Sequence, residues 1–168
     1  LMAYEEAGYK VVHKGENFEI RYYEERIVIQ TRYDSGNSGF RKLFNYISGQ
    51  NQGEKKIEMT TPVTEVQDDN QMVMQFYLPA RFNSSSAPLP ADNSLEIATI
   101  DAGYFAVIQY SGFASNKNFY KHAQILKSSL DRDNIKISSQ PIKATYNGPF
   151  TLPNLRRNEA MYLVLWDN

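Results

Sequence analysis

The sequence contains no cysteine, and its charge is nearly balanced, with 18 Lys and Arg against 19 Asp and Glu. Without cysteine there is no disulfide framework, no thiolate nucleophile and no cysteine-ligated metal site. A balanced charge provides no electrostatic footprint for nucleic acid, and no apolar run approaches the roughly 20 residues that span a bilayer. We therefore expect no nucleic-acid partner and no integral membrane segment.

Histidine is scarce as well, since the chain has His13 and His122 alone. Two isolated histidines do not make a zinc site of the usual kind without help from carboxylates. We expect His13, in a charged segment, to be solvated, and His122, beside an apolar helical stripe, to be half-buried and bonded to a neighbour. The sequence has no Ser-His-Asp order, no glycine-rich phosphate loop and no His-Glu-x-x-His motif, so it indicates no common enzyme class.

Aromatic residues, by contrast, are abundant: the 168 residues include 12 Tyr, 9 Phe and 1 Trp. Tyr and Phe bury large areas, and Tyr adds a polar tip. This composition favours β structure, or a pocket lined by flat side chains. The length predicts a single domain over 1–168, and at this size roughly 70% of the unfolded surface can be buried without disulfides.

Residue spacing predicts both strands and helices. Alternating and β-branched segments predict strands over 18–23, 27–33, 56–66, 71–79, 95–100, 104–110, 142–146 and 160–166. The first two are either separate strands or one long bent strand. Apolar residues at helical spacing predict one helix over 40–47 and another that begins at Ser115 or Asn116. We expect 80–94 to be a connector and 147–154 to be a loop stiffened by two prolines.

The two halves share the order strand, helix, strand, strand. Val28-Ile29-Gln30 recurs 79 residues later as Val107-Ile108-Gln109, and Pro62 and Pro141 are separated by the same 79 residues. We therefore predict two βαββ pseudo-repeats, over about 16–80 and 95–168. Proline in a sheet belongs at a strand's first residue, at an edge or at a bulge, so the two prolines would mark matching corners.

Matching corners would curl the sheet. The predicted fold class is therefore α+β, with a curled antiparallel sheet, or distorted open β-barrel, flanked by two helices. Ligands favour the concave surface of such a sheet.

Four segments together resemble the SOUL haem-binding family: 4–23, which ends in FEIRYY, GFRKLFNYISG at 39–49, KKIEMTTPV at 55–63, and YNGPFTLPNLRRNE at 146–159. Their order and spacing cover nearly the whole chain. The resemblance implies an α+β barrel of two βαββ repeats, similar to gyrase-inhibitor-like domains, the regulatory-factor effector-binding fold. For function it implies non-catalytic binding of haem or a related tetrapyrrole in an apolar cleft.

The chain departs from the family at two positions. A haem-ligating His of one branch is matched by Tyr22, a candidate iron ligand that would need a basic partner to lower its pKa. Arg21 is adjacent, but along a strand it points to the opposite face. A basic residue in the loop before Arg-Arg-Asn-Glu is matched by Leu152.

We expect the pocket near the first helix, the Met-Thr-Thr-Pro corner and the 147–158 loop. Apolar contacts with haem or another planar apolar molecule would come from Phe150 and Leu152. Arg41, Lys42 or Arg156 would pair with the propionates.

Other roles remain open for three residues near this pocket. Met59 offers a thioether to iron, although a core position suits it equally. Arg156 could instead form an ion pair with Glu159 and lock the loop to the sheet, as could Arg157. Tyr146 is expected to belong to a hydrophobic lip.

Three further functions stay open from the residues alone. Glu159 could face the cleft and bind cationic aromatic ligands, as an acid does in some gyrase-inhibitor-like domains. A small hydrolase acting on apolar substrates would be favoured by a buried glutamate beside a tyrosine hydroxyl. A protein-interaction module would be favoured if the cleft were filled by side chains.

The compartment is open from the sequence. No signal peptide is visible, but the chain opens Leu1-Met2, as a processed or truncated form would after removal of a leader. We expect a soluble protein, cytoplasmic or periplasmic.

Overall fold

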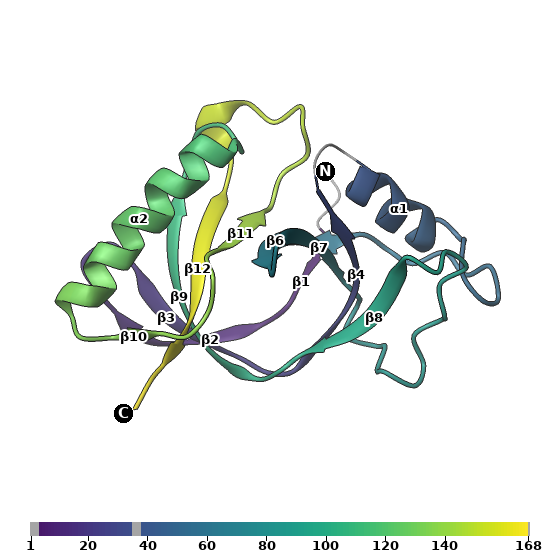
Figure 1. Ribbon diagram of the computed structural model, residues 1–168, viewed down its shortest axis with the longest axis horizontal. Helices are drawn as coiled ribbons and strands as arrows, with labels where there is room; N and C mark the ends of the chain where they lie inside the picture. The colour runs from purple at the N-terminus through teal and green to yellow at the C-terminus, as the bar shows by residue number, and fades with distance from the viewer. Residues whose placement is uncertain (1–3, 35–37, 168) are drawn as a thin grey trace. The chain divides into compact units, whose positions relative to one another are not determined.

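The computed structural model describes residues 4–34 and 38–167. The Leu1-Met2 start, on which the expectation of processing rests, lies outside these ranges. The chain divides into two compact units: the first comprises residues 1–7 and 25–101, and the second comprises residues 8–24 and 102–168. Each unit contains a β-sheet and a helix (Figure 1).

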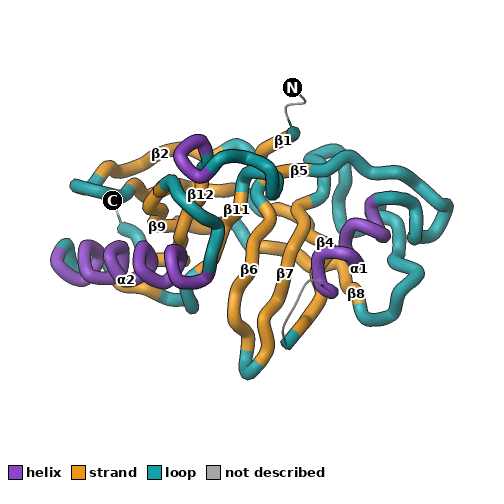
Figure 2. The backbone as a smooth tube through the Cα atoms, turned by 90° about the horizontal axis from the view of Figure 1, so that it is seen from above, coloured by secondary structure: helices purple, strands orange, loops and turns teal. Residues whose placement is uncertain are grey.

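The elements of the first unit are β1 (Glu5–Glu6), β4 (Arg26–Tyr33), α1 (Ser38–Ile47), β5 (Thr60–Thr61), β6 (Val63–Asp68), β7 (Gln71–Tyr77) and β8 (Leu95–Ile100). Its sheet is antiparallel and runs β8-β4-β7-β6. A short parallel pair of β1 and β5 accompanies it. Figure 2 shows α1 beside β4 and β8, with β6 and β7 forming a long hairpin.

The core of the first unit lies between α1 and β4 and β7. From α1, the side chains of Leu43, Tyr46 and Ile47 are buried in it. The Tyr46 hydroxyl donates to the carbonyl of Pro88 at 2.5 Å, which ties the 80–94 connector to the helix. Phe40 and Phe44 stack on each other with ring centroids 6.2 Å apart and stay partly exposed.

The elements of the second unit are β2 (Tyr9–Lys14), β3 (Glu19–Tyr23), β9 (Gly103–Tyr110), α2 (Asn116–Arg132), β10 (Lys136–Ile137), β11 (Ile142–Thr145), the 3-10 turn η1 (Pro153–Leu155) and β12 (Asn158–Leu165). Its antiparallel sheet runs β2-β3-β9-β12-β11. The short strand β10 pairs with the end of β12.

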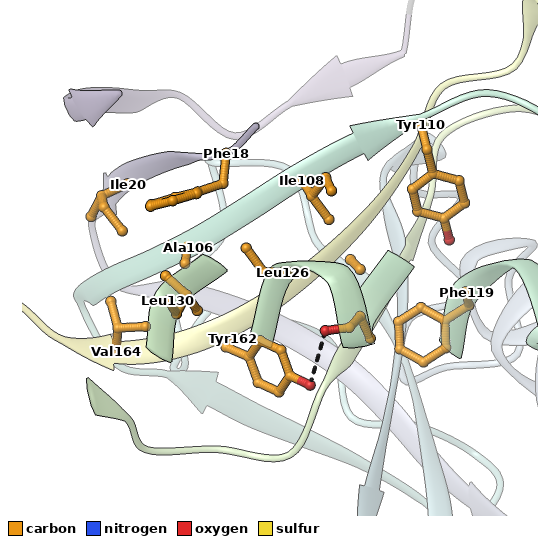
Figure 3. Packing of buried hydrophobic residues seen from close by; sticks show 12 residues of the cluster. Phe18, Ile20, Ala106, Ile108, Tyr110, Phe119, Leu126, Leu130, Tyr162 and Val164 are labelled. Carbon is orange, nitrogen blue, oxygen red and sulfur yellow. Dashed lines mark hydrogen bonds between the residues drawn. The ribbon is translucent and has the colours of Figure 1, made fainter. Parts of the chain in front are cut away.

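The helix α2 packs along one face of this sheet, as Figure 3 shows. Ser115 caps it by accepting the backbone N–H of Asn118 at 3.1 Å, as the sequence predicts. Phe119, Ala123, Leu126, Ser129 and Leu130 are the buried residues of α2. The predicted apolar stripe is thus the buried face.

The alternative of one long bent strand is wrong, and so is the extent of one other predicted strand. The segments 18–23 and 27–33 do not form one bent strand, because β3 pairs within the second unit and β4 within the first. The strand predicted over 56–66 begins at Thr60 instead. Ile57 donates its backbone N–H to the carbonyl of Ile47 at 2.8 Å and lies buried beside α1, so it is unavailable to a ladder.

The two units pair their strands in a corresponding order. The run β8-β4-β7-β6 of the first unit matches β3-β9-β12-β11 of the second. Pro62 precedes β6 and Pro141 precedes β11, and these strands occupy the same place in the two runs. The duplication itself stays a prediction, as does the division into pseudo-repeats at 16–80 and 95–168.

Candidate functional site

The sheet of the second unit has two chemically different faces, because side chains alternate along its strands. Ile20 of β3 and Ala160 of β12 pack under α2. On the other face, Arg21 of β3 reaches Glu159 of β12. We call this the polar face, and its members include Glu19, Arg21, Gln109 and Glu159.

Arg21 and Glu159 form a bidentate ion pair at the centre of the polar face. Arg21 Nη1 and Nη2 donate to the two carboxylate oxygens of Glu159, each at 2.9 Å. Both residues are buried, and Glu159 has 0% of its surface exposed. Paired, planar geometry of this kind is among the strongest hydrogen-bonded arrangements in proteins. Arg21 also donates from Nε to Glu19 at 2.8 Å and lies over the Tyr9 ring, 4.1 Å from its centroid.

Three more side chains complete what we call the Glu159 cluster: Tyr23, Tyr146 and Arg157. The Tyr146 hydroxyl donates to Glu159 Oε1 at 2.6 Å, and Arg157 Nε donates to Oε2 at 3.1 Å. Arg21 donates to the Tyr23 hydroxyl at 3.0 Å. Both oxygens of Glu159 therefore accept more than one hydrogen bond from the chain itself.

Burial and charge shift two titrations in this cluster. Burial by itself lowers the pKa of Arg21, but its hydrogen bonds to Glu159 and the carboxylate charge outweigh burial, so the pKa lies above its ordinary value. The pKa of Tyr146 is raised, first by burial and then by the negative charge of Glu159. Arg21 is thus a permanent cation, and Tyr146 is a permanent donor near neutral pH.

A hollow of about 250 Å³ opens beside Arg21 on the polar face. Its lining includes Lys14, Glu19, Val107 and Gln109. Pockets for drug-sized ligands occupy about 300–1,000 Å³. A tetrapyrrole therefore does not fit within this hollow, although a small polar molecule does.

The predicted site residues of the second unit fall in different places. Tyr22 packs on Tyr104 with ring centroids 5.1 Å apart, on the α2 side of the sheet and opposite Glu159. Phe150 is 97% exposed and Leu152 is 62% exposed in the loop between β11 and β12. The role of Tyr22 as an iron ligand stays a prediction, as does apolar contact by the two loop residues.

Arg156 serves the loop rather than Glu159. Its guanidinium donates to the carbonyls of Asn147, Gly148 and Thr151 at 3.1, 2.9 and 3.3 Å. The ion pair with Glu159 that was one of its two expected roles is made by Arg157 instead. Propionate pairing by Arg156 stays a prediction.

Arg41, Lys42 and Met59 belong to the first unit. Arg41 and Lys42 are exposed or half-buried on α1, and Lys42 Nζ donates to Ser94 Oγ at 3.1 Å. Met59 is partly buried against the core of that unit, which matches the alternative of a core position. Their ligand roles stay predictions.

Both histidines are held against aromatic rings. His122 stacks on Tyr110 with ring centroids 4.0 Å apart, and its Nδ1 lies 2.8 Å from the carbonyl oxygen of Asn118, as expected for a half-buried ring. His13 is half-buried and lies 4.9 Å from Trp166 between ring centroids, so solvent reaches only part of its ring. Within residues 4–34 and 38–167, no group of three or more His, Asp or Glu side chains could hold a metal ion.

Sequence reasoning missed most of the Glu159 cluster. Tyr146, expected in a hydrophobic lip, is buried and bonded to Glu159, because its hydroxyl requires a polar partner once buried. The prediction that Arg21 and Tyr22 point to opposite faces of the strand is correct. The remaining step, from Arg21 to Glu159, needed the pairing of β3 with β9 and of β9 with β12.

A family model described as "SOUL heme-binding protein" matches residues 4–163 of the chain. The chain belongs to the SOUL heme-binding protein family. Among curated proteins, this SOUL protein is 28% identical over 163 residues to Heme-binding protein 2 of Homo sapiens, covering 88% of the chain and 78% of the relative. It is 27% identical over 172 residues to Heme-binding protein 1 of Xenopus laevis, covering 92% and 89%.

Several solved structures share the fold of this SOUL protein. The EcmrR C-terminal domain matches with a TM-score of 0.63 at 16% identity, covering 94% of the chain and 98% of that domain. A hydrolase from Listeria innocua matches with a TM-score of 0.63 at 7% identity, covering 92% and 94%. The predicted α+β class, with a curled antiparallel sheet and two helices, is confirmed.

No helix in the described part of the SOUL protein is long and apolar enough to cross a membrane.

Proposed function

We propose that this SOUL protein binds haem or a related tetrapyrrole without catalysing a reaction on it. Membership of the family supports the proposal, as do the printed names of its relatives. Haem is a flat apolar molecule with anionic propionates, so a binding surface must combine large apolar side chains with cations.

The observation that carries the proposal is the loop of residues 147–157. It presents Phe150 and Leu152 to solvent, although exposed large apolar side chains that are gathered together usually mark a binding site. Arg156 holds the loop backbone through hydrogen bonds to its carbonyls and brings a positive charge to the same segment. The loop therefore offers the two kinds of group that haem requires.

Iron ligation by histidine plays no part in the proposal, because His122 is stacked on Tyr110 and His13 packs at a tilt against Trp166. Binding then rests on the porphyrin face and the propionates. Iron-free protoporphyrin should accordingly bind with an affinity similar to that of haem. Tyr22 takes no part in this contact, because it pairs through Tyr104 with the end of β12 that is remote from the loop. A Tyr22→Phe variant tests the predicted ligation separately: a changed haem spectrum would support it, and an unchanged one would contradict it.

Titration of haem into the purified protein, followed at the Soret band, tests the proposal. We expect saturable binding, weakened about tenfold in a Phe150→Ser/Leu152→Ser variant because two apolar contacts are lost. Leu165→Ser is the matched control: Leu165 is 60% exposed, but it lies at the other end of β12, about 20 Å away by strand rise. A spectrum equal to that of free haem at stoichiometric protein would overturn the proposal.

A hydrolase is the second candidate, because a buried glutamate does lie beside a tyrosine hydroxyl, in the pair Glu159 and Tyr146. The arrangement argues against it. Arg21 and Arg157 hold the carboxylate, and Glu159 has no exposed surface from which to reach a substrate. A cationic ligand at Glu159 is disfavoured for the same reason, because the guanidinium of Arg21 already binds both carboxylate oxygens. Release of p-nitrophenol from an apolar ester, lost in Glu159→Gln, would support the hydrolase.

A further inference from the structure

One end of the second unit exposes apolar side chains from two loops that are joined to each other. The backbone N–H of Gly112 donates to the carbonyl of Pro153 at 2.8 Å, and Asn158 Nδ2 donates to the Gly112 carbonyl at 3.0 Å. Next to these bonds, Phe113 is 69% exposed and Leu155 is 67% exposed. With Phe150 and Leu152, they form what we call the apolar tip.

The chain around the apolar tip carries cations and no acid. Residues 102–130 and 134–158 contain seven lysine or arginine residues and no aspartate or glutamate, although the whole chain has a net charge of −1. Lys117 and Lys121 lie exposed on the first turns of α2, just after Phe113. They are four residues apart and so share one side of the helix.

The acids nearest in the chain or in the sheet do not cancel this charge, since Glu159, which follows the tip segment, is fully buried and paired with both Arg21 and Arg157. Asp131, at the far end of α2, lies about 21 Å from Lys117 by helical rise. Glu16, in the turn between β2 and β3, pairs with Arg132 at 3.2 Å, and Glu19, the first residue of β3, pairs with Arg21 at 2.8 Å. The field at the apolar tip is therefore positive.

We propose that the apolar tip docks on the surface of an anionic lipid bilayer. Phe113, Phe150, Leu152 and Leu155 enter the headgroup region, while Lys117 and Lys121 pair with lipid phosphates and carboxylates. Peripheral binding of this kind combines apolar insertion with attraction to anionic lipid, and each cation near the surface adds to it. This inference goes beyond tetrapyrrole binding and does not depend on it.

Several observations favour lipid over a strand of nucleic acid. Single-stranded nucleic acid is held by flat rings that stack on bases, whereas two of the four tip side chains are leucines. The tip residues also come from loops and the η1 turn, whereas open sheet faces are the usual platforms for single strands. Aromatic rings beside cations are typical of the membrane–water interface, and Phe113 with Lys117 provides this combination.

Sedimentation with vesicles tests the proposal. We expect the wild-type protein to bind phosphatidylcholine vesicles that contain phosphatidylserine, and to bind pure phosphatidylcholine about tenfold more weakly. Phe113→Ser/Leu155→Ser should lose about tenfold, and Lys117→Glu/Lys121→Glu about thirtyfold. The matched controls are Leu165→Ser and Lys127→Glu, which change equally exposed residues away from the tip and should bind like the wild type.

Fluorescence quenching separates insertion from simple charge attraction. Phe113→Trp places an indole at the tip, while the natural Trp166 lies beyond the opposite end of β12. Brominated lipid chains should quench emission from Phe113→Trp and leave the wild-type emission unchanged. Binding that depends on the lysines but not on Phe113, or equal affinity for single-stranded DNA, would overturn the proposal.

Haem titration of the same variants keeps the two proposals separate. Phe113→Ser and Lys117→Glu/Lys121→Glu should bind haem like the wild type, because neither changes Phe150, Leu152 or Arg156. Failure of vesicle binding with intact haem binding overturns the lipid inference alone. The reverse result overturns the proposed function alone.

Discussion

On the sheet face opposite its helix, each unit carries a buried polar side chain at the same place in the strand order. In the first unit this is Gln75, which lies between Gln30 and Thr64 on the neighbouring strands. In the second unit it is Glu159, which lies between Gln109 and Ala144. The surroundings of these two side chains differ in charge.

An amide and a carboxylate need different neighbours. Gln75 accepts from the Thr64 hydroxyl at 2.8 Å and donates to Gln30 at 2.9 Å, so a neutral chain of hydrogen bonds satisfies it. A carboxylate only accepts, and Glu159 is therefore met by donors alone, from Arg21, Tyr146 and Arg157. The first unit has a neutral centre that tolerates change, and the second has an ionic centre whose members depend on one another.

The largest expected effect is that of removing the cation. Arg21→Met leaves Glu159 buried beside a single arginine, which should lower the free energy of unfolding by about 3–5 kcal/mol. The matched change in the first unit, Gln30→Met, removes the hydrogen bond from Gln75 and an exposed one to Glu96, and should cost about 1 kcal/mol. Urea unfolding at pH 7 measures both.

A double variant distinguishes lost charge from lost packing. Arg21→Met/Glu159→Leu removes both charges and should recover most of the stability, since well-packed apolar residues often replace buried ion pairs without loss. An Arg21→Met variant no less stable than Gln30→Met would contradict the comparison.

The converse change puts a charge into the neutral centre. Gln75→Glu introduces a carboxylate without an arginine and should cost about 2 kcal/mol at pH 7. Burial raises the pKa of a carboxyl in the folded state, so the variant should be most stable below pH ~4 and lose stability as pH rises. Unfolding midpoints from acid to neutral pH, compared with the wild type, would show this trend, and a pH-independent difference would rule it out.

Buried tyrosines extend the comparison to alkaline pH. Burial raises the pKa of Tyr46 to about 12, and burial together with the charge of Glu159 raises the pKa of Tyr146. Both folded-state pKa values exceed the unfolded value of roughly 10. The stability contributed by the protonated hydroxyls is therefore complete below pH ~10 and is lost as pH rises through the folded pKa values.

The anionic neighbour should make Tyr146 the more sensitive of the two. Tyr146→Phe should flatten the alkaline loss of stability more than Tyr46→Phe, at a cost of about 1 kcal/mol or more at neutral pH. Thermal melts from pH ~9 to beyond pH ~12, where the folded hydroxyl of Tyr46 ionises, would check both, with absorbance of tyrosinate as the second measurement. Equal alkaline profiles for the two variants would show that the carboxylate has no influence.

The smallest effect belongs to an exposed ion pair of the first unit. Arg32 Nη2 lies 2.7 Å from Asp68 Oδ2, but both side chains are substantially exposed. Water screens such pairs, so Asp68→Asn should leave the urea midpoint at its wild-type value. A loss as large as that of Arg21→Met would mean that burial does not explain the difference between the units.

Helices and strands could be predicted where apolar residues repeat at helical or alternating spacing over several turns or residues. The stripe of Phe119, Ala123 and Leu126 identified α2, and aromatic alternation identified β9. The strand β2 has mostly exposed residues and thus no alternation to detect, so it was missed. The start of the strand over 56–66 was misplaced because an apolar residue such as Ile57 suits either a strand of a sheet or a contact with a helix.

The candidate site was less predictable, because its members are far apart in the chain. Arg21 and Glu159 are separated by 138 residues, and only the pairing of three strands brings them together. Alternation along the strand placed Arg21 on the face opposite Tyr22, but it could not identify Glu159 as the partner of Arg21. The resemblance pointed to the loop of Phe150 and Leu152, and it contained no information on the ionic centre beside it.

Arg156 binds the backbone of the loop that precedes it in the chain. Because one guanidinium binds three of its carbonyls, the loop that carries Phe150 and Leu152 is ordered by hydrogen bonds of the chain itself. If haem binds there as proposed, little affinity should be lost to ordering the loop. Encounter by diffusion, and not rearrangement of the loop, should then limit the rate of association.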